Sequence, residues 1–496
     1  MQSNFCFIFV FLSLLNFTAV AQIVNPLDYG LIEAKTGVDR YEALLKCHSY
    51  AIRQGAKVSY AGISKIELEI PDKFSSIPLT YNTDFSGCTI VVTNIWKKVC
   101  LFSLSSEIIP IQVSAKSIDN ADYRSIEPLS KGTYLLVITD KNSWVDRRIG
   151  HDYGHNRKDV VLVKDGKGTS KPIMSYNNSY SKHVCAFRRV SEREKLFCNL
   201  HFVRSEKSTA ITTLVNVENE NNVSFRNITV VTPQGSGLKA DRLFRITNCT
   251  NVAFYDVKVD GTYSTEKDSG YAFYLNNVWN HTATNMEANG AWGVYGTNDV
   301  NKTVLNNCKL NRFDIHCYGR DVMAIDCIFN NLYNQFGSVF GKIEYKSCIF
   351  NNSVPFITGG SYKAFVGVDV EFTDCEFNIS KNNFNIVNIM KLGARESLRH
   401  ELKKKCLPNF TFINCSFNID SCVKHWYFFN LGNTKNVAPL GYISDIKMKN
   451  VIFNGNADLI LTKEKFETEN PLKVSLKNVY KLSKGKKTKL NSILIK

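Results

Sequence analysis

The chain has 496 residues, of which 44% are hydrophobic, 12% aromatic and 21% charged. This composition excludes a disordered or collagen-like protein, because such chains lack enough apolar side chains to bury a core. The length allows roughly two to four ordinary domains or one long solenoid. The formal net charge is +16, from 61 Lys and Arg against 45 Asp and Glu, which favours polyanionic partners or surfaces.

Residues 1–21 have the features of a secretory signal peptide. An apolar run over 5–17 is followed by Ala19-Val20-Ala21, a small-x-small cleavage pattern. The run is too short to span a bilayer comfortably, and no later stretch predicts an integral membrane segment. We therefore expect a soluble exported protein that begins near Gln22 and acts in the periplasm, on the cell surface or outside the cell.

The first predicted element of the mature chain is a helix over 39–54. Asp39 is the expected N-cap, with Glu42 three residues on in a capping-box arrangement, and Gly55 ends the helix. An amphipathic helix at this place can cover the hydrophobic end of a solenoid. Residues 105–210 fit no repeat and are expected to be an elaboration of the N-terminal part.

Five cysteines occupy the same position of a recurring local pattern. They are Cys308, Cys327, Cys348, Cys375 and Cys415. Sister copies of the pattern hold Ile228, Val257, Met286, Val451 and Val479. A position that accepts all of these residue types is an apolar core position, where a free Cys acts as a small buried hydrophobe. We expect an inward ladder of free thiols here, although export also allows a disulfide framework.

The spacing of this core position identifies the architecture. From Ile228 to Val451 it recurs at intervals of 19 to 40 residues, with short alternating strands between copies. Such repeats predict an all-β solenoid in which each repeat is one coil, and coils stack about 4.8 Å apart. The predicted fold is a single-stranded parallel β-helix with an N-terminal capping helix.

The same pattern divides the chain into parts. After the signal peptide, we expect a cap and elaborated first coils over 22–210, regular coils over 211–480 and a basic tail over 481–496. A basic amphipathic helix is expected as an insertion near 393–405. From Pro471 onward the chain has eight Lys and no acid. This end is either a solvated tail or an electrostatic attachment to anionic glycan or an envelope surface.

The opening of the mature chain resembles a known family. Asp28-Tyr29-Gly30, then Gly37-Val38-Asp39 and a helix, is similar to the start of pectin-lyase-like right-handed parallel β-helix proteins. Blocks such as NVWN, GAWGVYGTN, NRFDIHCYGRDV and YNQFGSVFG resemble uncharacterised exported members from polysaccharide-degrading bacteria. The resemblance implies right-handed coils over most of 22–480. The chain lacks the family's GDGxTDD opening and the Gly-His-Gly and Arg-Ile-Lys motifs of polygalacturonases, and a fold does not dictate a reaction.

Aligning the coils on the core position places aromatic and polar side chains in two outward columns. The first column holds Trp292, Asp314 and Tyr333, and the second holds Val294, His316 and Gln335, with Tyr271 extending the patch from the preceding coil. Aromatic faces can cover sugar rings while Asp, His and Gln bind hydroxyl groups. The patch is therefore a candidate sugar platform, or the ordinary surface of a solenoid.

The candidate catalytic residues Asp314, His316, Arg320 and Asp321 lie close together in this patch. A lyase acting on uronates needs a base, a carboxylate clamp and an acid, for which His316, Arg320 and Tyr318 are candidates.

A hydrolase instead needs two carboxylates across the bond, such as Asp314 with Asp321 or with Asp268. The competing structural interpretation is that Lys302, Asp321 and Lys342 stack as a salt-bridge ladder.

A second polar cluster covers 144–155 and contains His151 and His155. Glycines break this segment, so we expect a loop over the coil face and no metal site. Two function classes remain open. The first is an exported polysaccharide lyase or glycosidase acting on acidic polysaccharide, with Ca²⁺ as a possible cofactor if it is a lyase. The second is a non-catalytic glycan- or surface-binding β-helix, such as an adhesin or spike-like protein. Export argues against a nucleic-acid partner.

Overall fold

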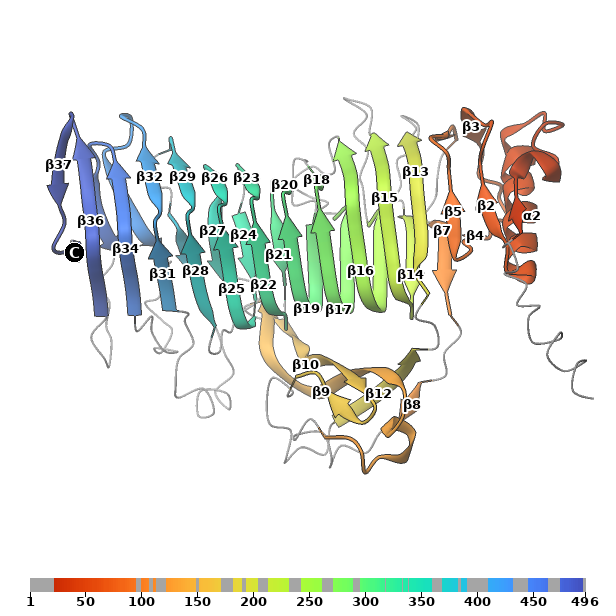
Figure 1. Ribbon diagram of the computed structural model, residues 1–496, viewed down its shortest axis with the longest axis horizontal. Coiled ribbons are helices and arrows are strands. Elements are labelled where there is room, and N and C mark those ends of the chain that lie inside the picture. The colour runs from red at the N-terminus through yellow and green to blue at the C-terminus, as the bar shows by residue number, and fades with distance from the viewer. Residues whose placement is uncertain are drawn as a thin grey trace, which may run out of the picture.

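The chain folds into a long stack of β-coils with a smaller sheet attached to its side (Figure 1). The computed structural model describes residues 22–94, 100–106, 110–112, 122–148, 151–170, 182–189, 193–203, 213–231, 242–260, 271–288, 295–316, 318–331, 333–337, 339–358, 368–381, 385–389, 409–430, 445–462 and 473–493. Strands of successive coils pair in parallel, so that equivalent positions repeat along one axis. The predicted all-β parallel β-helix is thereby confirmed.

The strands of the stack follow the chain order from one end of the molecule to the other (Figure 1). The first coils contain β1 (Ile23–Val24), β2 (Lys57–Ser59), β3 (Lys65–Leu68), β4 (Ile77–Pro78), β5 (Asn82–Asp84), β6 (Thr89–Val92) and β7 (Cys100–Ser105). The central coils contain β13 (Lys195–Val203), β14 (Thr213–Glu218), β15 (Asn221–Val231), β16 (Phe244–Asp260), β17 (Phe273–Thr284), β18 (Glu287–Ala288), β19 (Tyr295–Asn306), β20 (Lys309–Leu310), β21 (Phe313–Ile315) and β22 (Arg320–Ile325).

The last coils are built from shorter strands that end in a hairpin. They contain β23 (Ile328–Asn330), β24 (Tyr333–Phe336), β25 (Phe340–Lys346), β26 (Ile349–Asn351), β27 (Val354–Thr358), β28 (Asp369–Thr373), β29 (Glu376–Ile379), β30 (Val387–Ile389), β31 (Asn409–Ile413), β32 (Ser416–Ile419), β33 (His425–Asn430), β34 (Asp445–Asn454), β35 (Asp458–Thr462), β36 (Lys473–Ser483) and β37 (Lys486–Lys489). Strand β37 pairs antiparallel with β36 and exposes all four of its residues. Part of the expected basic tail is therefore a terminal strand, and the expected helix near 393–405 lies outside the described residues.

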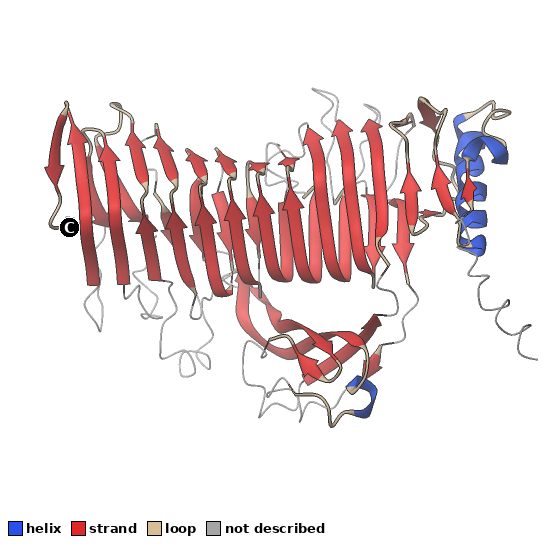
Figure 2. Ribbon diagram, in the orientation of Figure 1, coloured by secondary structure: helices blue, strands red, loops and turns tan. Residues whose placement is uncertain are grey.

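A single α-helix in the described part of the chain, α2 (Gly37–Gln54), covers the N-terminal end of the stack (Figure 2). It buries Tyr41, Leu44 and Cys47 against the first coils, as a solenoid cap should. The predicted N-cap was wrong by three residues. Thr36 is the N-cap, and its side chain and Asp39 complete the capping box reciprocally. No helix among the described residues is both long and apolar enough to cross a membrane.

The recurring core position lies inside the stack at every coil described. The five cysteines of the pattern are free and at most 2% exposed, which confirms the predicted inward thiol ladder. The residue before each of them has a left-handed backbone, for example Asn307 with φ 50°. Asn and Asp tolerate that conformation, and their side chains bond the equivalent turn of a neighbouring coil, as Asn307 Nδ2 donates to Asn285 Oδ1 of the preceding coil at 2.8 Å.

Most of the described strands within 105–210, the part that fits the repeat poorly, form a separate antiparallel sheet, whereas β13 of the same segment belongs to the stack. The order of the separate sheet is β11-β10-β9-β12-β8, from β8 (Ile111–Gln112), β9 (Thr133–Arg148), β10 (His151–Lys164), β11 (Lys167–Gly168) and β12 (Lys182–Arg189). The backbone over 144–155 thus belongs to two paired strands, and the side chains of 140–157 lie outside the description. The expected open loop at this place was wrong, because long antiparallel pairing continues almost to the turn.

The attached sheet docks on the outer face of the stack through a small mixed interface. Leu135, Val137 and Val160 pack on Trp279 of β17. Asn301 Nδ2 of β19 donates to Val160 O, and Lys158 Nζ lies 3.8 Å from Asp299 Oδ2. The sheet is therefore held beside the coils that carry the candidate site.

Candidate functional site

The predicted outward columns exist, but their register is shifted. Asp314 pairs with Gly296 on one side and with Gln335 on the other, so Asp314 and Gln335 share one column. The predicted partners of Asp314 were therefore wrong, by four residues for Trp292 against Gly296 and by two for Tyr333 against Gln335. A shift by an even number of residues keeps every side chain on its predicted face, because strand side chains alternate with period two. Ile315 and Phe336 accordingly point into the core, as predicted.

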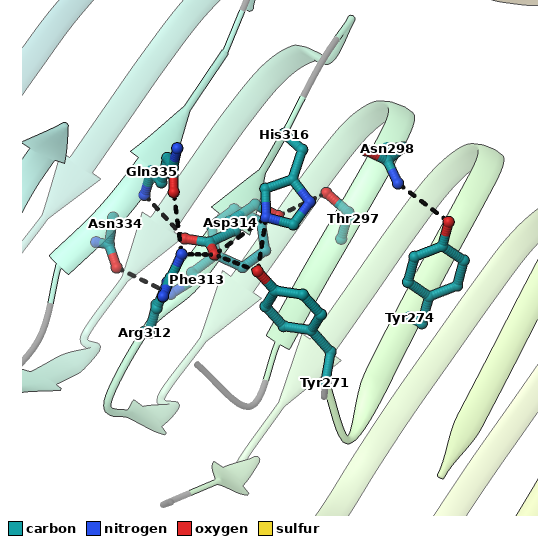
Figure 3. A network of polar contacts seen from close by, with 10 residues as sticks. All are labelled: Tyr271, Tyr274, Thr297, Asn298, Arg312, Phe313, Asp314, His316, Asn334 and Gln335. Atoms are coloured by element: carbon teal, nitrogen blue, oxygen red, sulfur yellow. Dashed lines mark hydrogen bonds and ion pairs between the residues drawn. The ribbon is translucent and has the colours of Figure 1, made fainter. Parts of the chain in front are cut away.

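Asp314 is the centre of a buried polar network at the start of this face (Figure 3). Its side chain is 0% exposed; Oδ2 lies 2.6 Å from Arg312 Nη2, and Oδ1 accepts from Gln335 N at 3.0 Å. Burial acts to raise the pKa of Asp314, but the Arg312 guanidinium and the His316 ring outweigh it and hold the pKa below its usual value. Asp314 is thus an ionised carboxylate that orients its neighbours.

Tyr271 and His316 form the second part of the network. The Tyr271 hydroxyl lies 2.7 Å from His316 Nε2 and 3.3 Å from Asp314 Oδ2, although the chain separates Tyr271 and His316 by 45 residues. His316 Nε2 itself lies 3.4 Å from Asp314 Oδ2. His316 is 7% exposed and Tyr271 is half-buried, so the pair reaches the surface at the edge of the network.

Arg312 completes the site, and it was not among the predicted site residues. Its guanidinium stacks 4.4 Å from the Tyr333 ring centroid and donates to Gln335 Oε1 at 3.0 Å. Burial opposes the charge of Arg312, but the Asp314 carboxylate raises its pKa overall. An Arg two residues before an Asp on a strand lies on the same face, and this spacing could have predicted the pair.

Three other predicted site residues, Tyr318, Arg320 and Asp321, are described but are not among the residues of the network in Figure 3. Tyr318 is 1% exposed with φ 56°, and Arg320 lies half-buried in β22. Asp321 has φ 52°, and its Oδ1 accepts from Lys342 N at 3.2 Å, which identifies it as a turn residue. Trp292 and Asp268 lie outside the described residues.

Lys302 and Asp321 lie opposite each other in strand register, as predicted, but the salt bridges expected between Lys302, Asp321 and Lys342 do not form among these described side chains. The Lys342 ammonium instead lies 2.8 Å from Glu344 Oε1 and 3.2 Å from Glu371 Oε2. The reason is the left-handed turn at Asp321, which directs its carboxylate to the backbone of the next coil.

The side chains of this network are better suited to proton transfer than to metal binding or to a reaction that needs two carboxylates. Within the described ranges, no group of three or more His, Cys, Asp or Glu side chains could hold a metal ion. One carboxylate is present, and it is buried against an Arg. The Tyr271 hydroxyl and the His316 ring, by contrast, share a hydrogen bond at the edge of the surface, where either can exchange a proton with a bound molecule.

Comparisons with known proteins support the fold class and do not identify a reaction. No family model and no curated protein matches the chain. The tailspike protein gp49 of Pseudomonas phage LKA1 has a TM-score of 0.56 at 13% identity, over 92% of this chain and 81% of that one. This likeness shows the fold alone, which is that of the right-handed parallel β-helix proteins.

Two further structures are similar at lower scores. The Gp54 tailspike of Acinetobacter baumannii bacteriophage AP22, in complex with capsular saccharide, has a TM-score of 0.48 at 14% identity, over 92% of this chain and 79% of that one. The surface adhesin PfbA of Streptococcus pneumoniae has a TM-score of 0.37 at 10% identity, over 86% of this chain and 92% of that one. The resemblance to the pectin-lyase-like family gains support for its fold only.

Proposed function

We propose that the protein binds an acidic polysaccharide across the Tyr271–His316 face and cleaves it by β-elimination. The observation that carries the proposal is the 2.7 Å contact between the Tyr271 hydroxyl and His316 Nε2, beside an ionised Asp314. The net charge of +16 supports an anionic substrate, because a positive surface raises the local concentration of a polyanion.

The reaction needs two proton transfers, which this pair can divide. A base removes the proton on the carbon beside the uronate carboxylate, the bond from the next carbon to the glycosidic oxygen breaks, and a carbon–carbon double bond forms. The leaving oxygen takes a proton from an acid. We assign the base to His316 and the acid to Tyr271, with Asp314 as a positioning residue, because it bonds both and is itself buried.

A hydrolase receives less support from the same residues. It needs two carboxylates facing each other across the scissile bond. Asp314 is sealed behind Arg312, and Asp321 is occupied in a turn. The second candidate is a non-catalytic glycan-binding β-helix, which the stacked and half-buried Tyr333 favours, since aromatic rings pack on sugars.

The signal-peptide pattern of residues 1–21 supports action outside the cytoplasm, where such polysaccharides occur. The purified protein should be incubated with polygalacturonate, alginate, hyaluronate and neutral dextran. Products should be followed by the ultraviolet absorbance of unsaturated uronates and by reducing ends. Unsaturated products from an acidic polymer support β-elimination, and reducing ends without them support a hydrolase. Binding without cleavage supports the second candidate.

A further inference from the structure

A second cationic feature lies on the same face as the Tyr271–His316 pair, toward the N-terminal end of the stack. The column of Asp314 and Gly296 continues through Tyr274 to Arg245 by strand register. Arg245 is therefore three coils from Asp314, or about 14 Å at the usual strand spacing. Its side chain is exposed, and no carboxylate in the described part of the chain lies within ion-pair distance of it.

Arg242 is held beside this column by an unusual backbone. It has φ 61°, a left-handed conformation that long side chains rarely adopt. Its N–H donates to Tyr271 O at 2.8 Å, which ties it to the coil of the proposed acid. The same conformation recurs at turns along the stack, for example at Lys302 with φ 60°, so it marks Arg242 as a turn residue whose position is set by the coil.

The Arg242 side chain is also fixed in place. Its guanidinium stacks over the Tyr274 ring at 4.2 Å, and the Tyr274 hydroxyl accepts from Asn298 Nδ2 at 3.2 Å (Figure 3 shows the Tyr274–Asn298 bond). Arg245 follows three residues later and is the register partner of Tyr274. One guanidinium thus stacks on Tyr274, and a second arginine occupies the neighbouring position of the same column on the preceding coil.

We propose that Arg242, Arg245 and Tyr274 form an anion subsite for a uronate carboxylate of the same glycan chain that reaches Tyr271 and His316. The inference rests on the proposed function for the identity of the chain. A planar guanidinium binds a carboxylate through two parallel N–H groups, and a ring-stacked guanidinium is already oriented. The glycan then lies along the axis of the solenoid, across at least the coils that start with β16, β17, β19 and β21.

The test compares two arginines, Arg245 and Arg226, each of which pairs in strand register with a tyrosine of the next coil. Arg245→Ala removes the exposed charge of the subsite. Arg226→Ala is the matched control, because Arg226 stacks over Tyr255 at 4.9 Å on another part of the coils and pairs with Glu194 at 2.7 Å. Binding to polygalacturonate, alginate, dextran sulfate and neutral dextran is measured by affinity electrophoresis and calorimetry at low salt and at physiological salt.

We expect Arg245→Ala to weaken uronate binding by about tenfold or more, as for loss of a charge-assisted contact, while Arg226→Ala stays near wild type. Arg242→Lys, which keeps the charge and loses the planar stack, should also weaken it. The subsite is overturned if Arg245→Ala and Arg226→Ala lose equal affinity for the uronate polymers. It is also overturned if Arg245→Ala loses as much affinity for dextran sulfate as for the uronate polymers.

The outcome for the subsite separates from that for the reaction. If Arg245→Ala changes nothing while Tyr271→Phe stops cleavage, the proposed reaction stands and the subsite is wrong. If Arg245→Ala abolishes binding of a uronate polymer that the wild type never cleaves, the subsite stands and the reaction is wrong. If no uronate polymer binds the wild type, both are wrong.

Discussion

Tyr271 and Gly296 fit together across adjacent coils of the stack. A Cβ atom built on Gly296 would lie 2.6 Å from carbons of the Tyr271 ring, closer than real Cβ contacts allow. The ring of Tyr271 therefore crosses the coil of Gly296 and carries its hydroxyl to His316 on the coil beyond. The missing side chain at position 296 is what makes the Tyr271–His316 contact possible.

Gly296→Ala should consequently displace Tyr271 while leaving the coils intact. We expect cleavage to fall at least as far as in Tyr271→Phe, with a modest loss of stability from the clash, about 1–3 kcal/mol. Thermal unfolding and product formation measure the two effects. In a Tyr271→Ala background the same change should cost little stability, because the ring is gone. If Gly296→Ala costs as much stability in the Tyr271→Ala background as in wild type, Gly296 acts on something other than Tyr271.

The interface of the attached sheet should make stability depend on pH. Burial raises the pKa of Asp299 to about 7, with Asp159 adding to the rise and Lys158 opposing it. The ordinary value is 3.8, so between about pH 4 and pH 7 the folded protein keeps a proton that the unfolded chain has lost. Stability should therefore fall as pH rises through this window and level off above it, by up to about 4 kcal/mol for this group.

Asp299→Asn tests this directly, because an amide resembles the protonated acid. The variant should be more stable than wild type at pH 8 and should lose most of the dependence between pH 4 and pH 7 in urea unfolding. Asp72→Asn, at an exposed carboxylate of the first coils, should leave the dependence unchanged. Parallel curves for wild type and Asp299→Asn would contradict the assignment to this carboxyl.

The thiol ladder predicts a specific response to substitution. Cys348 is fully buried, with Sγ 3.4 Å from Ala324 O. Cys348→Ser should destabilise by about 1–3 kcal/mol, because the hydroxyl loses water without gaining a comparable partner. Cys348→Val should be better tolerated, since Val occupies the position in sister coils.

Thiol counting in denaturant without reductant gives a second check on the ladder. All five ladder cysteines should react as free thiols, because each is free in the structure. The free energies of unfolding of Cys348→Ser and Cys348→Val are measured by urea unfolding. A loss of ladder thiols in the count would mean that disulfides form among them, contrary to the account.

The sequence predicted the fold well because the core position repeats without regard to loop length. Cys308, Cys327 and Val451 need only be apolar and inward, and turn residues such as Asn307 mark each copy. The columns of the site failed in register, because the turns between strands differ in length from coil to coil. A shift by two or four residues leaves the alternation of inward and outward side chains unchanged, so nothing in that pattern could reveal it.

The composition of the site was harder to predict than its place. Arg312 is a charged residue buried directly before β21, where its ion pair with Asp314 compensates for the loss of water. The reach of Tyr271 across two coils depends on Gly296, a relationship that exists only once the coils are stacked. The attached sheet has its own small core around Leu136 and Val161, so it leaves no trace in the repeat.

The most direct test of the account is the formation of unsaturated uronate by wild type and by two single variants, followed by ultraviolet absorbance on the acidic polymer that binds best. The account predicts that wild type forms the product and that Tyr271→Phe and His316→Ala lower the rate by about a hundredfold or more while binding persists, as for loss of a general acid or base. Unsaturated product at wild-type rates from both variants, or its absence with every acidic polymer that the wild type binds, would contradict it.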